Sequence, residues 1–154
     1  MLDIGKTAPD FSLLDEKGQN KTLKDFTGNW TVVYFYPKDD TPGCTKEACT
    51  ITEVYEEFSK LGVVVVGVSK DSPASHKKFK DKYSIPFILL SDESTEMIQA
   101  YEAWSEKSMF GKKYMGISRV SYILDPEGKV VKVYPKVSPD KHALELLKDL
   151  QDLI

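Results

Sequence analysis

The chain has few of the residues from which metal and disulfide sites are built. Its 154 residues include only two cysteines and two histidines. Two cysteines are too few for the disulfide framework of a small secreted domain. Together with His76 and His142 they match no familiar spacing of zinc or iron–sulfur ligands, so a metal-binding module is disfavoured. Each histidine stands beside a lysine in a segment that we expect to be helical, and we predict that both lie on the surface.

Strong net charge and long apolar segments are missing as well. The formal net charge is −3, which gives no basic footprint for nucleic acid or an anionic membrane. The longest apolar stretch, Leu61 to Val68, has about eight residues, whereas a bilayer span needs about 20. The N-terminus has no basic segment followed by an apolar one, so we expect no secretory signal. These absences predict a cytoplasmic protein with one domain over residues 1–154 and no nucleic-acid or membrane partner.

The elements that are present alternate between strand and helix. Apolar and β-branched runs predict strands at 31–36, 63–69 and 86–90 and a hairpin at 120–124 and 129–134. Helical spacing and start signals predict helices at 42–60, after Ser72, at 94–101 and after Ser138. This order predicts an α/β domain with a mixed sheet. Residues 102–118 form the one long irregular stretch and are expected to be a functional or mobile loop.

The most informative segment runs from Pro37 to Cys49. Thr41 and Pro42 are typical of the N-cap and first position of a helix, which places Cys44 in the first helical turn. Unpaired backbone N–H groups and the helix dipole favour an anion there, so Cys44 is expected to react as a thiolate. The alternative is an inert cysteine that fills a small buried space. The other thiol, Cys49, follows five residues later.

The same segment resembles a known family. Pro37-x-x-x-Thr41-x-x-Cys44 is similar to the active-site motif of the peroxiredoxins, which are thiol peroxidases. Cys49 looks like the resolving cysteine of the bacterioferritin-comigratory-protein or peroxiredoxin Q subfamily. The resemblance covers nearly the whole chain and includes three further segments: Ala8–Phe11, Leu90–Asp92 and Gly116–Arg119.

The resemblance implies both a fold and an activity. The fold would be thioredoxin-like, with a mixed central β-sheet flanked by helices and an N-terminal β-hairpin extension. The activity would be the reduction of hydrogen peroxide or organic hydroperoxides, with electrons from thioredoxin or a similar dithiol and with no metal or organic cofactor. Members of this type are often monomers, so we expect a monomer, with a dimer as the alternative.

Arg119 is the only arginine among 21 basic residues. Its planar, permanently charged guanidinium offers a geometry that lysine cannot reproduce. By similarity to the family, Arg119 would lie against the Cys44 sulfur, although a structural salt bridge is the competing interpretation. Glu47 would either support Arg119 or be a solvated helix residue. Met109 and Phe110 would either form an apolar wall beside the site or pack within their loop.

Ionisation of the thiol cannot explain fast peroxide reduction by itself. A free thiol with a pKa of about 8.5 is a few per cent ionised at neutral pH, so full ionisation gains roughly 30-fold. Further acceleration must come from donors aimed at the departing oxygen. We assign this role to Arg119, the Thr41 hydroxyl and the Cys44 backbone N–H, and we expect Pro37 to shield the site.

The spacing of the cysteines predicts a conformational change. Cys44 would form a sulfenic acid, and Cys49 would condense with it to a disulfide. In an intact helix, residues five apart have Cα atoms roughly 8–9 Å apart and side chains that diverge by about 140°. A disulfide needs Cα atoms within about 7 Å. We therefore predict that residues from Pro42 to about Thr52 unwind on oxidation.

Two other classes of function remain to be compared. A thioredoxin-like disulfide oxidoreductase without peroxidase activity would share the fold, but its signature is Cys-x-x-Cys and here four residues intervene. A non-enzymatic interaction domain is the other class. Peroxide consumption separates both of them from a peroxidase.

Overall fold

The computed structural model describes residues 1–154 and contains a seven-stranded mixed sheet. The strand order is β2-β1-β5-β4-β3-β8-β9. Neighbours β3, β4 and β5 are parallel, whereas β1, β8 and β9 run antiparallel to the strands they join. The strands are β1 Ser12–Asp15, β2 Asn20–Thr22, β3 Trp30–Phe35, β4 Val63–Ser69, β5 Ile88–Ser91, β8 Val120–Leu124 and β9 Val130–Tyr134.

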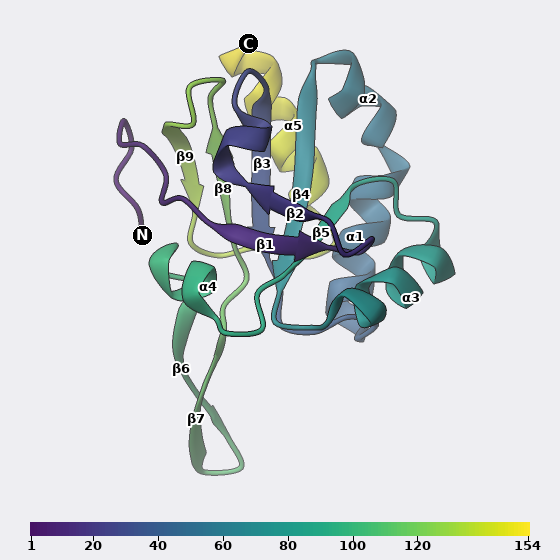
Figure 1. Cartoon of the computed structure of the whole chain (residues 1–154), viewed down its shortest axis with the longest axis vertical. Helices are drawn as coiled ribbons and strands as arrows, with labels where there is room; N and C mark the ends of the chain where they lie inside the picture. Colours follow the sequence, from purple (N-terminus) through teal and green to yellow (C-terminus); the bar gives the residue numbers. More distant parts are fainter.

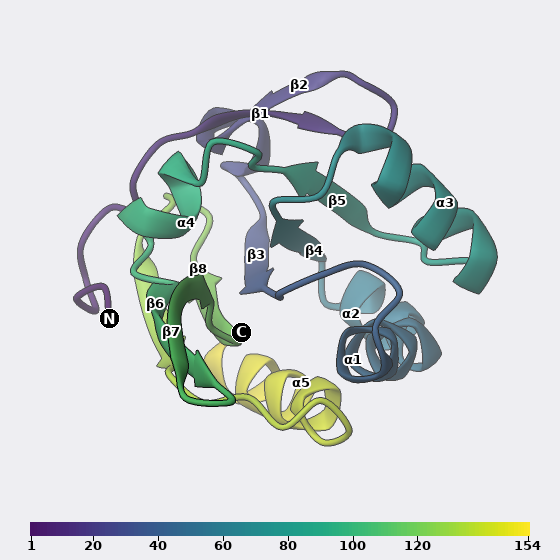
Figure 2. The same cartoon turned by 90° about the horizontal axis from the view of Figure 1, so that it is seen from below.

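Helices cover both faces of this sheet (Figures 1 and 2). One core contains side chains from α1, α2, α3 and α5 packed against β3, β4 and β5. The other core is closed by α4, by the short 3-10 helix Leu23–Phe26 and by the N-terminal segment. The helices are α1 Pro42–Glu53, α2 Tyr55–Lys60, α3 Pro73–Tyr83, α4 Glu96–Ala100 and α5 His142–Leu153. The predicted α/β, thioredoxin-like arrangement is confirmed.

The N-terminal β-hairpin is present and enlarges the main sheet. Strand β1 pairs with β2 to form the hairpin, and its other edge pairs antiparallel with β5. Thus the hairpin covers the edge of β5, which would otherwise end the sheet with unpaired backbone groups. It also places Phe11 in the core on the α4 side.

Two predicted elements differ from the structure. The predicted irregular stretch 102–118 is instead mostly a second hairpin, β6 Trp104–Met109 and β7 Lys112–Ile117, which pairs only with itself and projects from the body (Figure 1). Its outer residues are exposed on both faces, so the alternation that marks a half-buried strand is absent. The predicted helix 42–60 is interrupted at Val54, whose ψ of 15° is not helical, and continues as α2.

The prediction of surface histidines was wrong. His76 is fully buried and His142 is 1% exposed. Each ring has polar partners at both nitrogens: His76 contacts Asp39 and Leu90, and His142 contacts Glu145 and Ser121. The neighbouring lysines lie on the outer faces of the same helices, because positions adjacent in sequence diverge around a helix.

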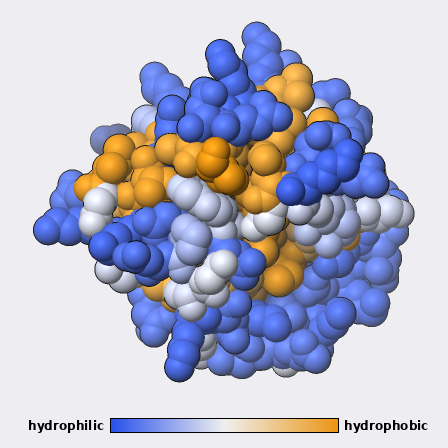
Figure 3. Space-filling view, turned by 90° about the horizontal axis from the view of Figure 1, so that it is seen from above, coloured by the Kyte–Doolittle hydropathy of each residue, from blue (hydrophilic) through white to orange (hydrophobic).

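Figure 3 shows the end of the molecule opposite the start of α1. Apolar side chains are visible there between charged ones, and the exposed C-terminal residues Leu153 and Ile154 lie toward this end. No helix combines the length and the apolar character that a bilayer crossing requires.

Candidate active site

The sheet topology brings Cys44 and Arg119 to the same end of the molecule. Strand β3 ends at Phe35, and a loop crosses from there to the start of α1, where Cys44 lies (Figure 2). Strand β8 runs antiparallel to β3, and its first residue, Val120, pairs with Phe35. Arg119 therefore enters the site from just before β8, 75 positions away from Cys44 in the chain.

Three side chains form a connected polar group. Arg119 Nη2 donates to the Cys44 sulfur at 3.2 Å, and Nη1 donates to Glu47 Oε1 at 3.3 Å. Cys44 and Glu47 are each 1% exposed, whereas the Arg119 side chain is 23% exposed. Cys44 and Glu47 are three residues apart, so they lie on the same helix face. The guanidinium thus connects a buried sulfur to a buried carboxyl group, and Glu47 supports Arg119 rather than facing solvent.

Burial sets the protonation of Glu47. Desolvation raises the pKa of its carboxyl group from 4.5 to about 7, and the Arg119 charge and hydrogen bond offset this only in part. Its second oxygen, Oε2, is buried without a hydrogen-bond partner. The Glu47 carboxyl group beside Arg119 therefore gains or loses its negative charge in the neutral pH range.

Gly43 makes the approach of Arg119 possible. A Cβ atom at this position would lie 2.6 Å from Nη2 and 3.3 Å from Cζ of Arg119. Any larger residue would therefore displace the guanidinium that contacts Cys44. We missed this role in the sequence, where Gly43 is visible only as a small residue between Pro42 and Cys44.

Thr41 and Pro37 lie in the loop before α1. Thr41 occupies the N-cap position with extended backbone, but its side chain makes no cap hydrogen bond. Its hydroxyl instead donates to the Lys38 carbonyl at 2.8 Å, which leaves the oxygen free to accept. Pro37 is half-buried directly after Tyr36, whose backbone N–H donates to Val68. The shielding role of Pro37 stays a prediction.

Cys49 is half-buried farther along α1, and both cysteines are free thiols. Desolvation raises the pKa of the Cys49 thiol, the nearby Glu53 charge raises it further, and Lys46 acts in the opposite direction. As the sequence predicted, the unbroken helix between Cys44 and Cys49 holds the two thiols on diverging sides.

Lys107 is a further residue that sequence reasoning missed. It lies on β6, and its Nζ donates to the backbone carbonyl of Ile117, two residues before Arg119. Burial and the Arg119 charge lower the pKa of Lys107, while Cys44 has the opposite effect. The β6–β7 hairpin thus places one cation close enough to Arg119 and Cys44 for their charges to affect it. Phe110, at the tip, is 98% exposed and packs against nothing.

Comparison with known proteins identifies the family. Residues 4–133 match the sequence pattern of the AhpC/TSA family. A putative peroxiredoxin Bcp of Coxiella burnetii is 47% identical over 146 residues, covering 95% of this chain and 97% of the relative. The chain belongs to the peroxiredoxins of the AhpC/TSA family. Peroxiredoxin Bcp of Bacillus subtilis is similar too, at 43% identity over 99% of this chain and 97% of its own length.

A solved structure supports the same placement among the peroxiredoxins. The bacterioferritin comigratory protein of Xanthomonas campestris matches with a TM-score of 0.91 and 38% identity, over 98% of this chain and 99% of that one. That structure is described as a trapped intermediate/ligand complex bearing on alkyl peroxide reduction. As a peroxiredoxin of the Bcp and Q type, the chain is a thiol peroxidase, and the disulfide-oxidoreductase alternative is not supported.

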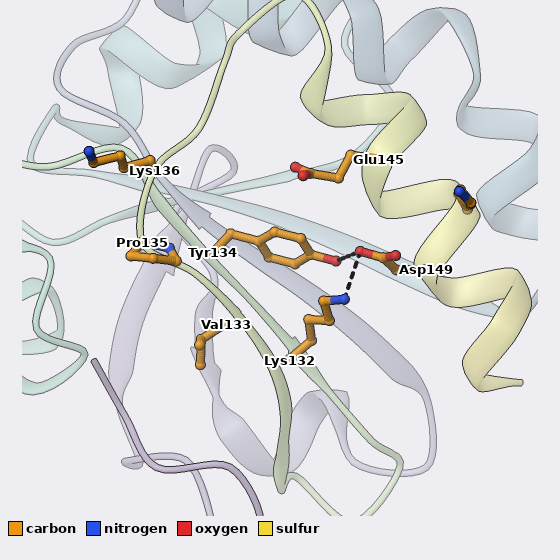
Figure 4. Close-up of a pocket in the computed structure, with 8 residues that line it drawn as sticks. Lys132, Val133, Tyr134, Pro135, Lys136, Glu145 and Asp149 are labelled. Atoms are coloured by element: carbon orange, nitrogen blue, oxygen red, sulfur yellow. Dashed lines mark hydrogen bonds and ion pairs between the residues drawn. The ribbon is translucent and has the colours of Figure 1, made fainter.

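A hollow lies between β9 and α5 (Figure 4). At its centre the Tyr134 hydroxyl donates to Asp149 at 2.5 Å, and Lys132 pairs with the same carboxylate at 3.3 Å. None of the residues that the sequence predicts for the site lines this hollow. The three polar groups at its centre, from Tyr134, Lys132 and Asp149, are bonded to one another.

Proposed function

We propose that Cys44 is the nucleophile that reduces hydrogen peroxide or an organic hydroperoxide. The observation that carries this proposal is the 3.2 Å contact between Arg119 Nη2 and the buried sulfur in the first turn of α1. The thiolate attacks one peroxide oxygen, and the O–O bond breaks. The products are a sulfenic acid on Cys44 and an alkoxide or hydroxide that takes up a proton.

The surrounding groups orient the peroxide and stabilise the departing oxygen. Arg119 and the Cys44 backbone N–H are donors, and the first intrahelical bond of α1 begins only at the Thr45 N–H. The Thr41 hydrogen is engaged by the Lys38 carbonyl, so its oxygen accepts a hydrogen bond from the peroxide. We therefore propose an acceptor role for Thr41 in place of the donor role that the sequence suggested.

Cys49 then resolves the sulfenic acid. Its thiol condenses with Cys44–SOH, forming the S–S bond and releasing water. The step requires the first turns of α1 to unwind, and the unwinding also removes the burial that raises the Cys49 pKa. The second thiol therefore becomes a better nucleophile at the moment when it can reach the first.

An external dithiol of the thioredoxin type then reduces the Cys44–Cys49 disulfide by exchange. This return to two thiols favours a reducing compartment, and we therefore place the protein in the cytoplasm. Each site residue comes from one chain, which is compatible with a functional monomer. No metal or organic cofactor takes part in the proposed cycle.

The proposal is tested by peroxide consumption coupled to NADPH oxidation through thioredoxin and thioredoxin reductase. The wild type should turn over with hydrogen peroxide or an organic hydroperoxide such as cumene hydroperoxide. Cys44→Ser should abolish turnover, whereas Cys49→Ser should allow oxidation of Cys44 but block recycling through the disulfide. Wild-type protein that consumes neither peroxide would overturn the proposed function.

A further inference from the structure

A buried polar cluster holds the loop that precedes Cys44. Asp39 lies in the middle of this loop and is 8% exposed. Its carboxylate accepts hydrogen bonds from the Tyr36 hydroxyl at 2.6 Å and from the Ser75 hydroxyl of α3 at 2.8 Å. Its backbone N–H donates to the Asp71 carboxylate at 2.9 Å. Both its main chain and its side chain are therefore attached to fixed parts of the molecule.

His76 connects this cluster to the central sheet. The ring is fully buried, with Nδ1 2.7 Å from Asp39 Oδ2 and Nε2 2.9 Å from the backbone carbonyl of Leu90. A carbonyl oxygen and a carboxylate oxygen both accept hydrogen bonds, so Nε2 donates to Leu90 and Nδ1 donates to Asp39. His76 thus links the loop before α1, helix α3 and strand β5 through a single side chain.

The cluster is complete within the chain. Both carboxylate oxygens of Asp39 and both ring nitrogens of His76 have partners, and no further ligand is needed to satisfy them. The next loop residue provides a contrast, because Asp40 pairs with Lys82 at 2.8 Å and with Tyr83 at 2.7 Å on the surface. An exposed ion pair restrains its partners weakly, whereas a buried network with fixed geometry restrains them strongly.

We propose that His76 is a positioning residue for the peroxide step. By fixing Asp39, it fixes the orientation of the loop through Thr41, whose oxygen receives the peroxide. Thr41 is two residues from Asp39, so it lies within about 7 Å of it along the chain. The proposal rests on the proposed role of Thr41 and adds a residue that does not touch the substrate.

The same contacts define the fixed end of the helix that unwinds. Asp39 is held by Tyr36, by Asp71 and by two residues of α3, Ser75 and His76, and none of these belongs to α1. Pro42 to Thr52 can therefore change conformation while the loop keeps its place. On refolding, α1 begins again from the same point, with Thr41 correctly oriented.

The proposal separates orientation of the peroxide from reactivity of the sulfur. The contact of Cys44 with Arg119 does not involve Asp39 or His76. Loosening the loop should therefore slow reaction with hydrogen peroxide, which needs the oriented Thr41 oxygen. It should leave alkylation by iodoacetamide nearly unchanged, because that reaction needs only the thiolate.

The test compares these two rates in reduced wild type, His76→Asn, Asp39→Asn and Lys82→Ala. Stopped-flow kinetics gives the rate constant for Cys44 oxidation by hydrogen peroxide, and mass spectrometry follows alkylation of Cys44. We expect the peroxide rate of His76→Asn and Asp39→Asn to fall between about tenfold and a hundredfold, because a displacement of about 1 Å has effects of that size. Lys82→Ala, which removes the exposed ion pair of Asp40 but leaves its hydrogen bond with Tyr83, should match wild type in both rates.

Each outcome decides between the alternatives. If folded His76→Asn or Asp39→Asn oxidises at the wild-type rate, His76 has no positioning role. If peroxide and iodoacetamide rates fall by the same factor, the cluster acts on the sulfur, and the proposal is equally wrong. Should His76→Asn fail to fold, Asp39→Asn, which keeps the size of the side chain, gives the same comparison. Wild-type Cys44 that reacts with neither hydrogen peroxide nor cumene hydroperoxide would instead refute the proposed function.

Discussion

At the residue scale, the buried carboxyl group of Glu47 links the stability of the fold to pH. Below its ordinary pKa of 4.5 the group is protonated in both the folded and the unfolded chain. Between 4.5 and about 7 the folded chain keeps a proton that the unfolded chain has lost. The folded state is therefore favoured at low pH, and this contribution is lost as the pH rises to about 7.

Glu47→Gln should remove this dependence. The shift from 4.5 to about 7 corresponds to a cost of about 3 kcal/mol at pH 8 and about 1 kcal/mol at pH 5. We expect the variant to exceed wild type in free energy of unfolding by about these amounts, measured by urea denaturation of the reduced protein. Glu53→Gln, at an exposed position of the same helix, should show no such difference. If Glu47→Gln changes the free energy of unfolding equally at pH 8 and pH 5, the raised pKa of Glu47 is wrong.

Gly43→Ala should disconnect Arg119 from Cys44. The added methyl group would lie 2.6 Å from Nη2, so the guanidinium must move by about 1 Å. We expect the rate constant with hydrogen peroxide to fall about a hundredfold. The stability of the helix should not fall, because alanine is the better helix former.

A double variant shows whether the loss runs through the guanidinium. In an Arg119→Lys background the added methyl group no longer faces a guanidinium, so Gly43→Ala should have a much smaller further effect. Additive losses would mean that the methyl group acts by another route.

The sequence predicted some of these residues and not others for a physical reason. Cys44 was found from its helix-start context, and Arg119 stood out because no other arginine exists. The role of Gly43 and the burial of Glu47 depend on how closely β8 approaches α1, which no local pattern encodes. For the histidines a signal was present: His76 lies three residues before the buried Phe79, on the same helix face.

At the element scale, the proposed Cys44–Cys49 disulfide requires α1 to change conformation once per turnover. Hydrogen exchange followed by mass spectrometry should show faster exchange in Pro42 to about Thr52 in the disulfide form than in the reduced form. Because Val54 already separates the helices, the amides of α2 should keep their protection. Cys49→Ser treated with peroxide should retain the reduced pattern. Equal protection of α1 in both forms would show that no unwinding occurs.

The exposed tip of the β6–β7 hairpin contributes less to the free energy of unfolding than the buried base of the same hairpin does. Phe110 is 98% exposed at its tip, so Phe110→Ser should change the free energy of unfolding by less than about 0.5 kcal/mol. Ile117→Ala, at the buried base of the same hairpin, should cost about 2–5 kcal/mol. Denaturant titration of the two variants checks the contrast, and a large loss from Phe110→Ser would show that the tip packs against the body.

The hairpin also shows where element prediction reached its limit. Five strands of the main sheet, β3, β4, β5, β8 and β9, were predictable because burial on one or both faces leaves apolar runs or alternation. The β1–β2 hairpin was expected only from the family resemblance. β6 and β7 bury almost nothing, so their pairing leaves no such pattern. The break at Val54 was missed for the opposite reason, since the apolar spacing continues through it to Phe58.

At the scale of the whole molecule, the sequence order predicted the layers but not the full sheet. Alternating strands and helices indicated an α/β domain with a mixed sheet and a hairpin. In the structure β3, β4 and β5 are parallel, and β8 and β9 form the hairpin. That β1 lies beside β5, and β8 beside β3, follows from long-range pairing that local spacing does not contain. The second of these pairings matters for function, because it brings Arg119 to Cys44.

Mass spectrometry after one equivalent of hydrogen peroxide tests the central claim most directly. The account predicts a Cys44–Cys49 disulfide in wild type and a sulfenic acid, trapped by dimedone, on Cys44 in Cys49→Ser. Arg119→Lys should give the same products more slowly. A sulfenic acid on Cys49, or peroxide-treated wild type with both thiols still free, would contradict it.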